Sequence, residues 1–351
     1  MFNHNHYVPI LRWKRGERIS VRKLTQIQKD SITPLIEFVP PRPPSKNAKN
    51  PKPVDQLYKE LIAHIPKQIL KDWGKDPIFV DFQHLDDSYQ LSALQEVIES
   101  SRNLGLYLIP VIYLKSNSSF TKAALGANNG LCLRVQRQEL NSTLRTAIDH
   151  FTKEYELRKE QTDLIFDFGI TDDQCSSLTG IDTQSTDLHS WRTFTVASGC
   201  FVEDLQDFEP GRNEVNRIDW EAWLKLINAL GVDRKPAFGD YTIQYPLYRE
   251  LAGGGNPTAS IRYTLRDKYV IWRGRSLRTF GFPQYIANAN LLSKMPEFFG
   301  KDFSYGDSYI TLISQGLIQG DTSNTGNTTT WLAAGINHHL SVVVDQISSL
   351  S

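Results

Sequence analysis

Eight short runs of apolar, β-branched or aromatic residues recur through the first two thirds of the chain, and they constrain the fold more than any other feature. The runs are YVPIL (7–11), PLIEF (34–38), PIFVDF (77–82), LIPVIYL (108–114), LCLRV (131–135), LIFDF (164–168), RTFTVAS (192–198) and PAFGDY (236–241). Neighbouring runs start far enough apart to leave room for a helix and two loops between them. This spacing predicts alternating strands and helices.

Strands that are apolar on both faces and separated by helices indicate a parallel sheet covered by helices. Helical periodicity or cap residues support helices over 54–72, 88–104, 139–160 and 219–230. Eight such strands favour closure into a (β/α)8 barrel over an open doubly wound sheet. We therefore predict a TIM-like α/β barrel.

The last third of the chain departs from this alternation. The segments ASIRYT (259–264) and KYVIWRG (268–274) predict an antiparallel hairpin, and 331–349 predicts a final helix. We expect residues 1–242 to carry the barrel strands and helices, 243–327 to be a long insertion after strand eight, and 328–351 to end the barrel. The insertion follows the carboxyl end of a strand, so we expect it to cover the carboxyl-end face of the barrel. Barrels of this kind have their active sites on that face.

The composition narrows the possible partners and the cell compartment. Thirty-nine Lys and Arg residues balance thirty-nine Asp and Glu residues, so no overall field favours nucleic acid or an anionic membrane. The three cysteines show no CxxC spacing, which argues against a disulfide framework and against a cysteine zinc site. No signal peptide or long apolar run is present, and we expect a cytoplasmic protein that has no membrane partner.

Carboxylates interrupt several of the apolar runs. In LIFDF, Asp167 shares a face with Ile165, whereas Phe166 and Phe168 point the other way. The same alternation holds for Glu37 in PLIEF and Asp81 in PIFVDF. We expect these carboxylates to face the barrel axis at the carboxyl ends of their strands, and Asp240 in PAFGDY to take the same position on strand eight.

Other polar side chains stand at the strand ends and would share this mouth: Arg12, Lys14, Tyr113, Arg134 and Ser198. The functional interpretation makes the four carboxylates catalytic, with Glu37, Asp81 and Asp167 holding Mg²⁺ or Mn²⁺. The basic side chains would then bind a phosphate group, which predicts metal-assisted phosphoester or nucleotide hydrolysis. Two alternatives stay open: acid–base catalysis on a glycoside, and a closed salt-bridge layer such as Glu37–Arg134 that needs no ligand.

The predicted hairpin carries a second candidate surface. Arg262, Trp272 and Arg273 could supply guanidinium and aromatic groups that stack on a nucleotide base, although ordinary hairpin packing is the favoured explanation for them. Aromatic residues are frequent across the insertion, a composition typical of interface anchors. The set comprises Tyr245, Tyr248, Trp272, Tyr285 and Tyr305.

Several segments together resemble the Beta protein family of phages and bacterial genomes. They are YVPILRWKRGE, TPLIEF, FGDY (238–241), the hairpin strands IRYT and KYVIWRG, YGDSYI (305–310) and TTWLAAGINHHL (329–340). Members of this family tend to occur near mobile elements and phage-defence genes. The resemblance implies a part in phage–host conflict, as effector, sensor or accessory subunit, and it assigns no role to any residue.

Two functional hypotheses therefore lead, ahead of a purely structural role. The first is a defence-associated barrel hydrolase that acts on a phosphate-containing small molecule or nucleotide. The second is a non-catalytic module that senses such a ligand or docks another protein of a defence assembly.

Overall fold

Eight parallel strands close into a barrel in the computed structural model, which describes residues 2–44, 49–171, 187–229, 234–249, 257–319 and 323–350. They are β1 (Tyr7–Arg12), β2 (Leu35–Glu37), β3 (Ile78–Asp81), β4 (Leu108–Ile112), β5 (Leu131–Gln136), β6 (Thr162–Ile170), β7 (Thr193–Gly199) and β9 (Ala237–Asp240). The parallel pairing of β9 with both β7 and β1 closes the ring. Each predicted run overlaps one of these strands, and the TIM-like barrel is confirmed.

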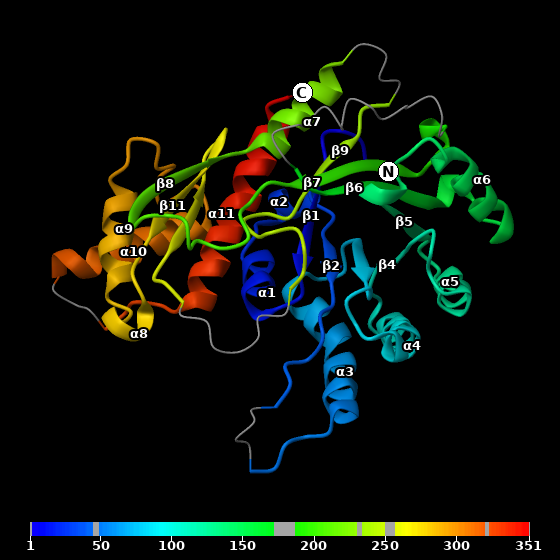
Figure 1. Cartoon of the computed structure of the whole chain (residues 1–351), viewed down its shortest axis with the longest axis horizontal. Helices are drawn as coiled ribbons and strands as arrows, with labels where there is room; N and C mark the ends of the chain where they lie inside the picture. The colour runs from blue at the N-terminus through cyan, green and yellow to red at the C-terminus, as the bar shows by residue number, and fades with distance from the viewer. Residues whose placement is uncertain are drawn as a thin grey trace.

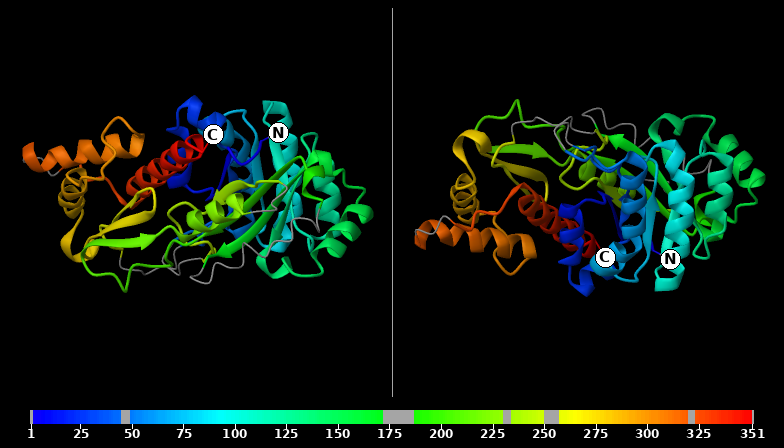
Figure 2. Two further views of the ribbon diagram at one scale, coloured as in Figure 1. Left: turned by 90° about the horizontal axis from the view of Figure 1, so that it is seen from above. Right: turned by 90° about the horizontal axis from the view of Figure 1, so that it is seen from below.

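Helices pack around the strands (Figure 1). They are α1 (Arg15–Arg22), α2 (Gln26–Asp30), α3 (Val54–Asp72), α4 (Asp87–Leu104), α5 (Ser118–Leu125), α6 (Leu144–Glu154), α7 (Ile218–Asn228) and α11 (Thr328–Ser348). Gly105 ends α4 in the left-handed conformation that glycine tolerates best. Asn327 caps α11, and its side chain accepts from the backbone N–H groups of Thr329 and Thr330. The last helix lies beside α1, as Figure 2 also shows.

Side chains alternate between two apolar layers along the barrel strands. The inner layer, which fills the barrel, consists of Val8, Ile10, Leu35, Phe79, Ile109, Val111, Cys132, Ile165, Ala197, Ala237 and Tyr241. The outer layer, between sheet and helices, includes Phe38, Phe82, Phe166 and Phe168. The predicted alternation along β2, β3 and β6 is therefore correct, since Leu35, Phe79 and Ile165 lie in the inner layer and the four phenylalanines above lie in the outer one.

A small antiparallel sheet stands beside the barrel, in the order β10–β11–β8. The predicted hairpin forms its first two strands, β10 (Ile261–Thr264) and β11 (Lys268–Arg273). The third strand, β8 (Gly211–Asn216), was not predicted, because GRNEVN contains one apolar residue and alternates between half-buried and exposed positions. Its strand character comes from pairing with β11.

The insertion builds a side lobe around a second apolar core (Figure 1, left). Its helices are α8 (Leu277–Phe280), α9 (Gln284–Ser293) and α10 (Tyr305–Gln319), and β10 and α10 pack on α11. The lobe extends to the side of the barrel in both views of Figure 2. The contacts with the barrel mouth described below come from residues 241–248, which span the boundary at residue 243 where the predicted insertion begins.

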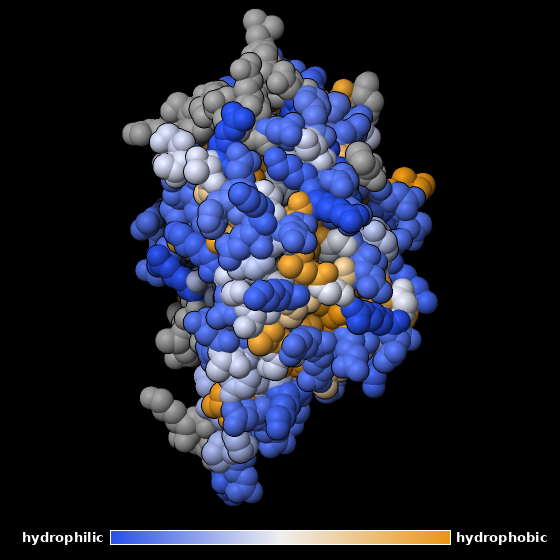
Figure 3. All heavy atoms as spheres, turned by 90° about the vertical axis from the view of Figure 1, so that its right-hand side faces the viewer, coloured by the Kyte–Doolittle hydropathy of each residue, from blue (hydrophilic) through white to orange (hydrophobic). Residues whose placement is uncertain are grey.

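The surface shows mostly hydrophilic residues with small apolar areas between them on the face of Figure 3. The exposed large apolar side chains are spread over many elements, from Ile27 in α2 to Leu312 in α10. Within the described ranges, no helix combines the length and the hydropathy that a membrane span requires.

Candidate functional site

The carboxyl ends of β2, β3, β5 and β6 bring a buried polar cluster together at the barrel mouth. The strand register places Glu37 beside Asp81, and Gln136, two residues after Arg134, beside Asp167. Glu37, Asp81, Arg134 and Asp167 are all buried. The structure thus gathers three of the four predicted carboxylates around one predicted basic residue, and we call these four residues the arginine layer.

One guanidinium pairs with all three carboxylates of the arginine layer. Nη1 of Arg134 lies 2.9 Å from Oε1 of Glu37 and 2.8 Å from Oδ2 of Asp81. Its Nη2 lies 2.7 Å from Oδ2 of Asp167, to which Nε also donates at 2.9 Å. This is the closed salt-bridge arrangement that the sequence left open as an alternative, and it includes the Glu37–Arg134 pair.

Two tyrosine hydroxyls complete the cluster. Tyr113 donates to Oδ2 of Asp81 at 2.5 Å, and Tyr241 donates to Oδ2 of Asp167 at 2.7 Å. Burial raises the pKa of both tyrosines well above the usual value, and the neighbouring carboxylates add to the shift. Both hydroxyls therefore stay protonated and act as donors.

The carboxylates respond differently to their shared cation. Burial alone would raise the pKa of Glu37, but the charge of Arg134 and the contact with His84 outweigh it and lower the pKa to about 2. Burial raises the pKa of Asp81, and the attraction of Arg134 only partly offsets it, since the Glu37 charge adds to the rise. Arg134 and His84 therefore hold Glu37 in its ionised form more firmly than Arg134 holds Asp81.

The predicted Mg²⁺ or Mn²⁺ site finds no counterpart in this geometry. Each of the three carboxylates already contacts the guanidinium of Arg134, whose positive charge would repel a second cation. Across the described ranges, no three carboxylate, imidazole or thiol groups are arranged to hold a metal ion. The shared cation of this cluster is Arg134 itself.

Asp240 does not join the arginine layer, and its predicted orientation is wrong. Its carboxylate accepts from the Tyr7 hydroxyl at 2.5 Å and lies 2.8 Å from Nε2 of His339, in α11. Ala237 in β9 and Tyr241, which directly follows β9, are the residues that face the barrel interior here. The sequence held the signal, because Phe238 lies two residues before Asp240 and so shares its face.

Ser198 was also assigned to the wrong face. It shares the alternation of Phe194 and Val196, which belong to the outer apolar layer, whereas Ala197 faces the barrel interior. Its hydroxyl therefore points toward the helix layer and away from the mouth.

Basic and aromatic side chains surround the mouth above the arginine layer. The Arg12 guanidinium donates to the carbonyls of Tyr245 and Leu247 at 2.7 and 2.8 Å, and it lies 5.6 Å from the centre of the Tyr248 ring. The ammonium group of Lys14 lies 5.1 Å from the same ring. The structure therefore brings Arg12 and Lys14 together on one aromatic platform.

His84 is a mouth residue that the sequence interpretation missed. Its Nε2 lies 3.2 Å from Oε2 of Glu37, and its ring centre lies 4.8 Å from that of Tyr248. The side chain is 20% exposed, so it connects the buried layer with the outside. A signal existed, since His84 follows the strand end at Asp81 by three residues. Arg12, Lys14, His84 and Tyr248 are called the rim below.

The predicted hairpin residues make contacts away from this rim. Arg262 donates to the carbonyl of Ile243 at 2.7 Å and stacks on Phe201, and burial lowers its pKa to about 10. The Trp272 indole donates to Sδ of Met295 at 3.2 Å, inside the side lobe. Arg273 is half-buried at the end of β11. Arg262 and Trp272 therefore make the contacts expected of ordinary hairpin packing, which was the alternative to stacking on a nucleotide base.

The described cysteines carry no exposed reactive group. Cys132 lies inside the barrel, and Cys200 is a free thiol 3.1 Å from Oδ1 of Asp219. Burial raises the pKa of both thiols, and the carboxylate of Asp219 adds to the shift at Cys200. Cys175 lies outside the described residues.

Comparison with known proteins agrees with the resemblance seen in the sequence motifs. No curated protein matches the chain. The Beta protein family matches residues 7–345, a range that includes the barrel strands, the side lobe and nearly all of α11. The chain belongs to the Beta protein family.

Proposed function

We propose that this barrel is a non-catalytic ligand-binding module of a phage–host conflict or antiviral defence system. Its mouth takes a phosphate-containing small molecule or a nucleotide. The observation that supports this choice is the pairing of Arg134 with Glu37, Asp81 and Asp167. Carboxylates that already share a guanidinium are poor ligands for a catalytic metal, which removes the main support for the metal-assisted hydrolase.

The rim supplies the groups that an anionic ligand needs. Arg12 and Lys14 are cations held near one ring, and guanidinium and ammonium groups are the usual phosphate partners in proteins. The half-buried ring of Tyr248 contacts both cations, and aromatic rings of this kind stack on nucleobases. Phosphate and base recognition are therefore available within one small area.

The contact between Glu37 and His84 also favours a ligand. Oε2 of Glu37 and Nε2 of His84 are buried atoms 3.2 Å apart, yet neither has a well-aligned hydrogen bond. Buried polar atoms in this condition are uncommon in native proteins, and a bound group or water usually satisfies them. A ligand oxygen at the rim could accept from His84.

Thermal unfolding with inorganic phosphate and a panel of nucleotides, with and without Mn²⁺, tests this function. We expect at least one of these compounds to raise the melting temperature without Mn²⁺ and without release of phosphate. Lys14→Gln should reduce that rise, whereas Lys67→Gln, an exposed lysine on α3, should leave it unchanged. Absence of any stabilisation across the panel would refute the binding site.

Hydrolysis without a metal is the second candidate, and the Glu37–His84 contact favours it. A carboxylate next to a partly exposed histidine is a common acid–base arrangement. In that case phosphate would appear without Mn²⁺, and His84→Gln would abolish its release while the ligand still stabilised the protein. Stabilisation without release supports the binding module instead.

The defence role rests on membership of the Beta protein family. Its test is the efficiency of plating of a phage panel on cells that express the chain. We expect wild type and Lys67→Gln to change plating equally, and Lys14→Gln to lose the effect. If all three proteins gave the same efficiency of plating, the rim would have no role in phage–host conflict.

A further inference from the structure

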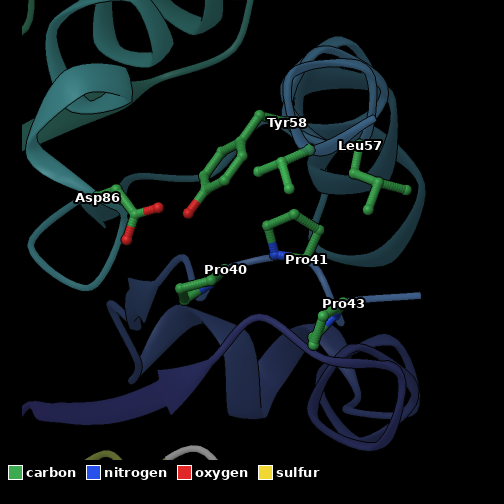
Figure 4. Close-up of a pocket in the computed structure, with 7 residues that line it drawn as sticks. Pro40, Pro41, Pro43, Leu57, Tyr58 and Asp86 are labelled. Atoms are coloured by element: carbon green, nitrogen blue, oxygen red, sulfur yellow. The ribbon is translucent and has the colours of Figure 1, made fainter. Parts of the chain in front are cut away.

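A groove near the carboxyl ends of β2 and β3 forms a second site, separate from the rim (Figure 4). Its volume is about 180 Å³, and it is lined by Pro40, Pro41, Pro43, Val54, Leu57, Tyr58 and Asp86. The three prolines belong to the segment that follows β2. The residues Val54, Leu57 and Tyr58 belong to α3, and Asp86 lies directly before α4. The lining is apolar except at one end, where the Tyr58 hydroxyl points toward the carboxylate of Asp86.

The polar end of the groove is incomplete. Tyr58 is 2% exposed, and its buried hydroxyl lies near Asp86 without a well-aligned hydrogen bond. Burial raises the pKa of Tyr58 to about 12, and the contact of its hydroxyl with the Asp86 side chain adds to the shift. Asp86 occupies the N-cap position of α4, but its side chain caps no backbone N–H. Both groups therefore have capacity for a further partner at this end.

The apolar walls are held in place by rigid or packed groups. Proline rings fix their own backbone angles, so the floor of the groove needs little ordering when a ligand binds. Tyr58 stacks on Tyr89 with ring centres 3.8 Å apart, which fixes the direction of its hydroxyl. Val54 is 53% exposed at the open side, so an aliphatic group that enters the groove would remove apolar surface from water.

Charge decides the class of occupant. Asp86 is the one charged residue of the lining, and a cation placed between it and the Tyr58 hydroxyl would use both. Three basic residues lie close to the lining in sequence: Arg42, exposed on the proline segment, Lys59, exposed next to Tyr58 on α3, and Lys52, which pairs with Glu60 at 2.7 Å. A lysine combines an apolar four-carbon stem with a compact ammonium group that has three donors. We propose that the groove binds a lysine side chain of a partner protein, with its stem on the prolines and its ammonium group between Asp86 and Tyr58.

The test uses the full chain, labelled with ¹⁵N, and a lysine capped at both ends as the probe. The capped norleucine analogue has the same apolar stem without the charge. We expect the lysine probe to shift the amide signals of Leu57, Tyr58 and Asp86 in a saturable way and to bind about tenfold more tightly than norleucine. No saturable shift, or equal affinity for norleucine, would overturn the proposal.

Variants separate the groove from general surface charge. Asp86→Asn should weaken lysine binding about tenfold, whereas Asp87→Asn, the exposed neighbour outside the lining, should not change it. Tyr58→Phe keeps the ring stack and removes the hydroxyl, and it should weaken binding by a smaller factor. Unchanged affinity in Asp86→Asn, or equal losses in Asp86→Asn and Asp87→Asn, would contradict the assignment. Both groove variants should still bind the phosphate or nucleotide that binds at the rim. A loss of lysine binding can then be assigned to the groove, whether or not the proposed function of the rim is correct.

Discussion

Arg134 lies at the centre of the barrel mouth, and a carboxylate oxygen of each of three acidic residues is within 2.9 Å of its guanidinium. Burial of these charges is expensive, and their pairing with one another is what makes it tolerable. A single cation faces three carboxylates, so the hydroxyls of Tyr113 and Tyr241 matter as neutral donors to Asp81 and Asp167. The inward carboxylates are accounted for by this pairing.

Glu37 gives the layer a pH dependence with a defined sign. Its pKa is lowered to about 2 in the folded protein, so the ionised form contributes stability above the unfolded value of about 4.5. That contribution is lost as the pH falls from about 4.5 toward 2. We expect Glu37→Gln to flatten the pH dependence of the free energy of unfolding in this window. Urea unfolding of the wild type and the variant at several pH values measures this dependence. If the free energy of unfolding changed with pH in the same way for both proteins, the lowered pKa of Glu37 would be contradicted.

The sequence predicted the arginine layer only in part, for reasons that are visible at single residues. Glu37, Asp81 and Asp167 interrupt apolar runs with a fixed alternation, so their direction followed from strand geometry. Asp240 was misplaced because its outward neighbour Phe238 was not used to set the phase. The pairing of Arg134 with three carboxylates depends on closure of the barrel, which no local pattern encodes.

At the scale of elements, a buried histidine on α11 joins the side lobe to the barrel. His338 lies 2.8 Å from Oδ2 of Asp307 in α10 through Nδ1, and 2.8 Å from the carbonyl of Thr264 in β10 through Nε2. Asp307 also accepts from the hydroxyl of Tyr263. Three elements from distant parts of the sequence therefore meet at one imidazole.

Loss of this imidazole should loosen the lobe. We expect His338→Ala to lower the free energy of unfolding by about 3 kcal/mol, because Asp307 would stay buried without its main partner. Hydrogen exchange should become faster in β10 and α10. His150→Ala, on the exposed face of α6, is the matched control and should change neither quantity. An unaffected lobe in His338→Ala would show that the contact is not a structural link.

Glycine allows α10 and α11 to approach closely. A Cβ atom at Gly306 would collide with the carbonyl oxygen of Ala334 and lie 2.9 Å from Cβ of His338. We expect Gly306→Ala to destabilise the protein by about 2 kcal/mol, since the helices must move apart. Ser308→Ala on the exposed side of α10 is the control. Thermal unfolding checks both, and equal melting temperatures would refute the close contact.

For the whole molecule, the eight barrel strands could be predicted because each one is a distinct apolar run. The side lobe was harder: β8 is polar and owes its strand state to β11, and α9 owes its place to the second apolar core. The rim was missed at His84 because a histidine in a loop carries little information without the position of Glu37. Long-range pairing, which local sequence does not show, explains these omissions.

The rim and the groove share one region of the molecule. Both lie toward the carboxyl ends of the barrel strands, where loops of different elements meet. The rim offers cations to an anionic ligand, and the groove offers a carboxylate to a cationic side chain. The two sites thus differ in charge, so their ligands and test variants can be told apart.

Asp167→Asn tests most directly whether the inward carboxylates form an ion-pair layer. Its free energy of unfolding should be compared with that of the wild type by urea denaturation at neutral pH. We predict a loss of about 3 kcal/mol, because the change removes a buried partner of Arg134 while Tyr241 and the backbone stay in place. Unchanged or increased stability, together with loss of a Mn²⁺-dependent release of phosphate, would contradict the ion-pair layer and restore the metal-assisted hydrolase.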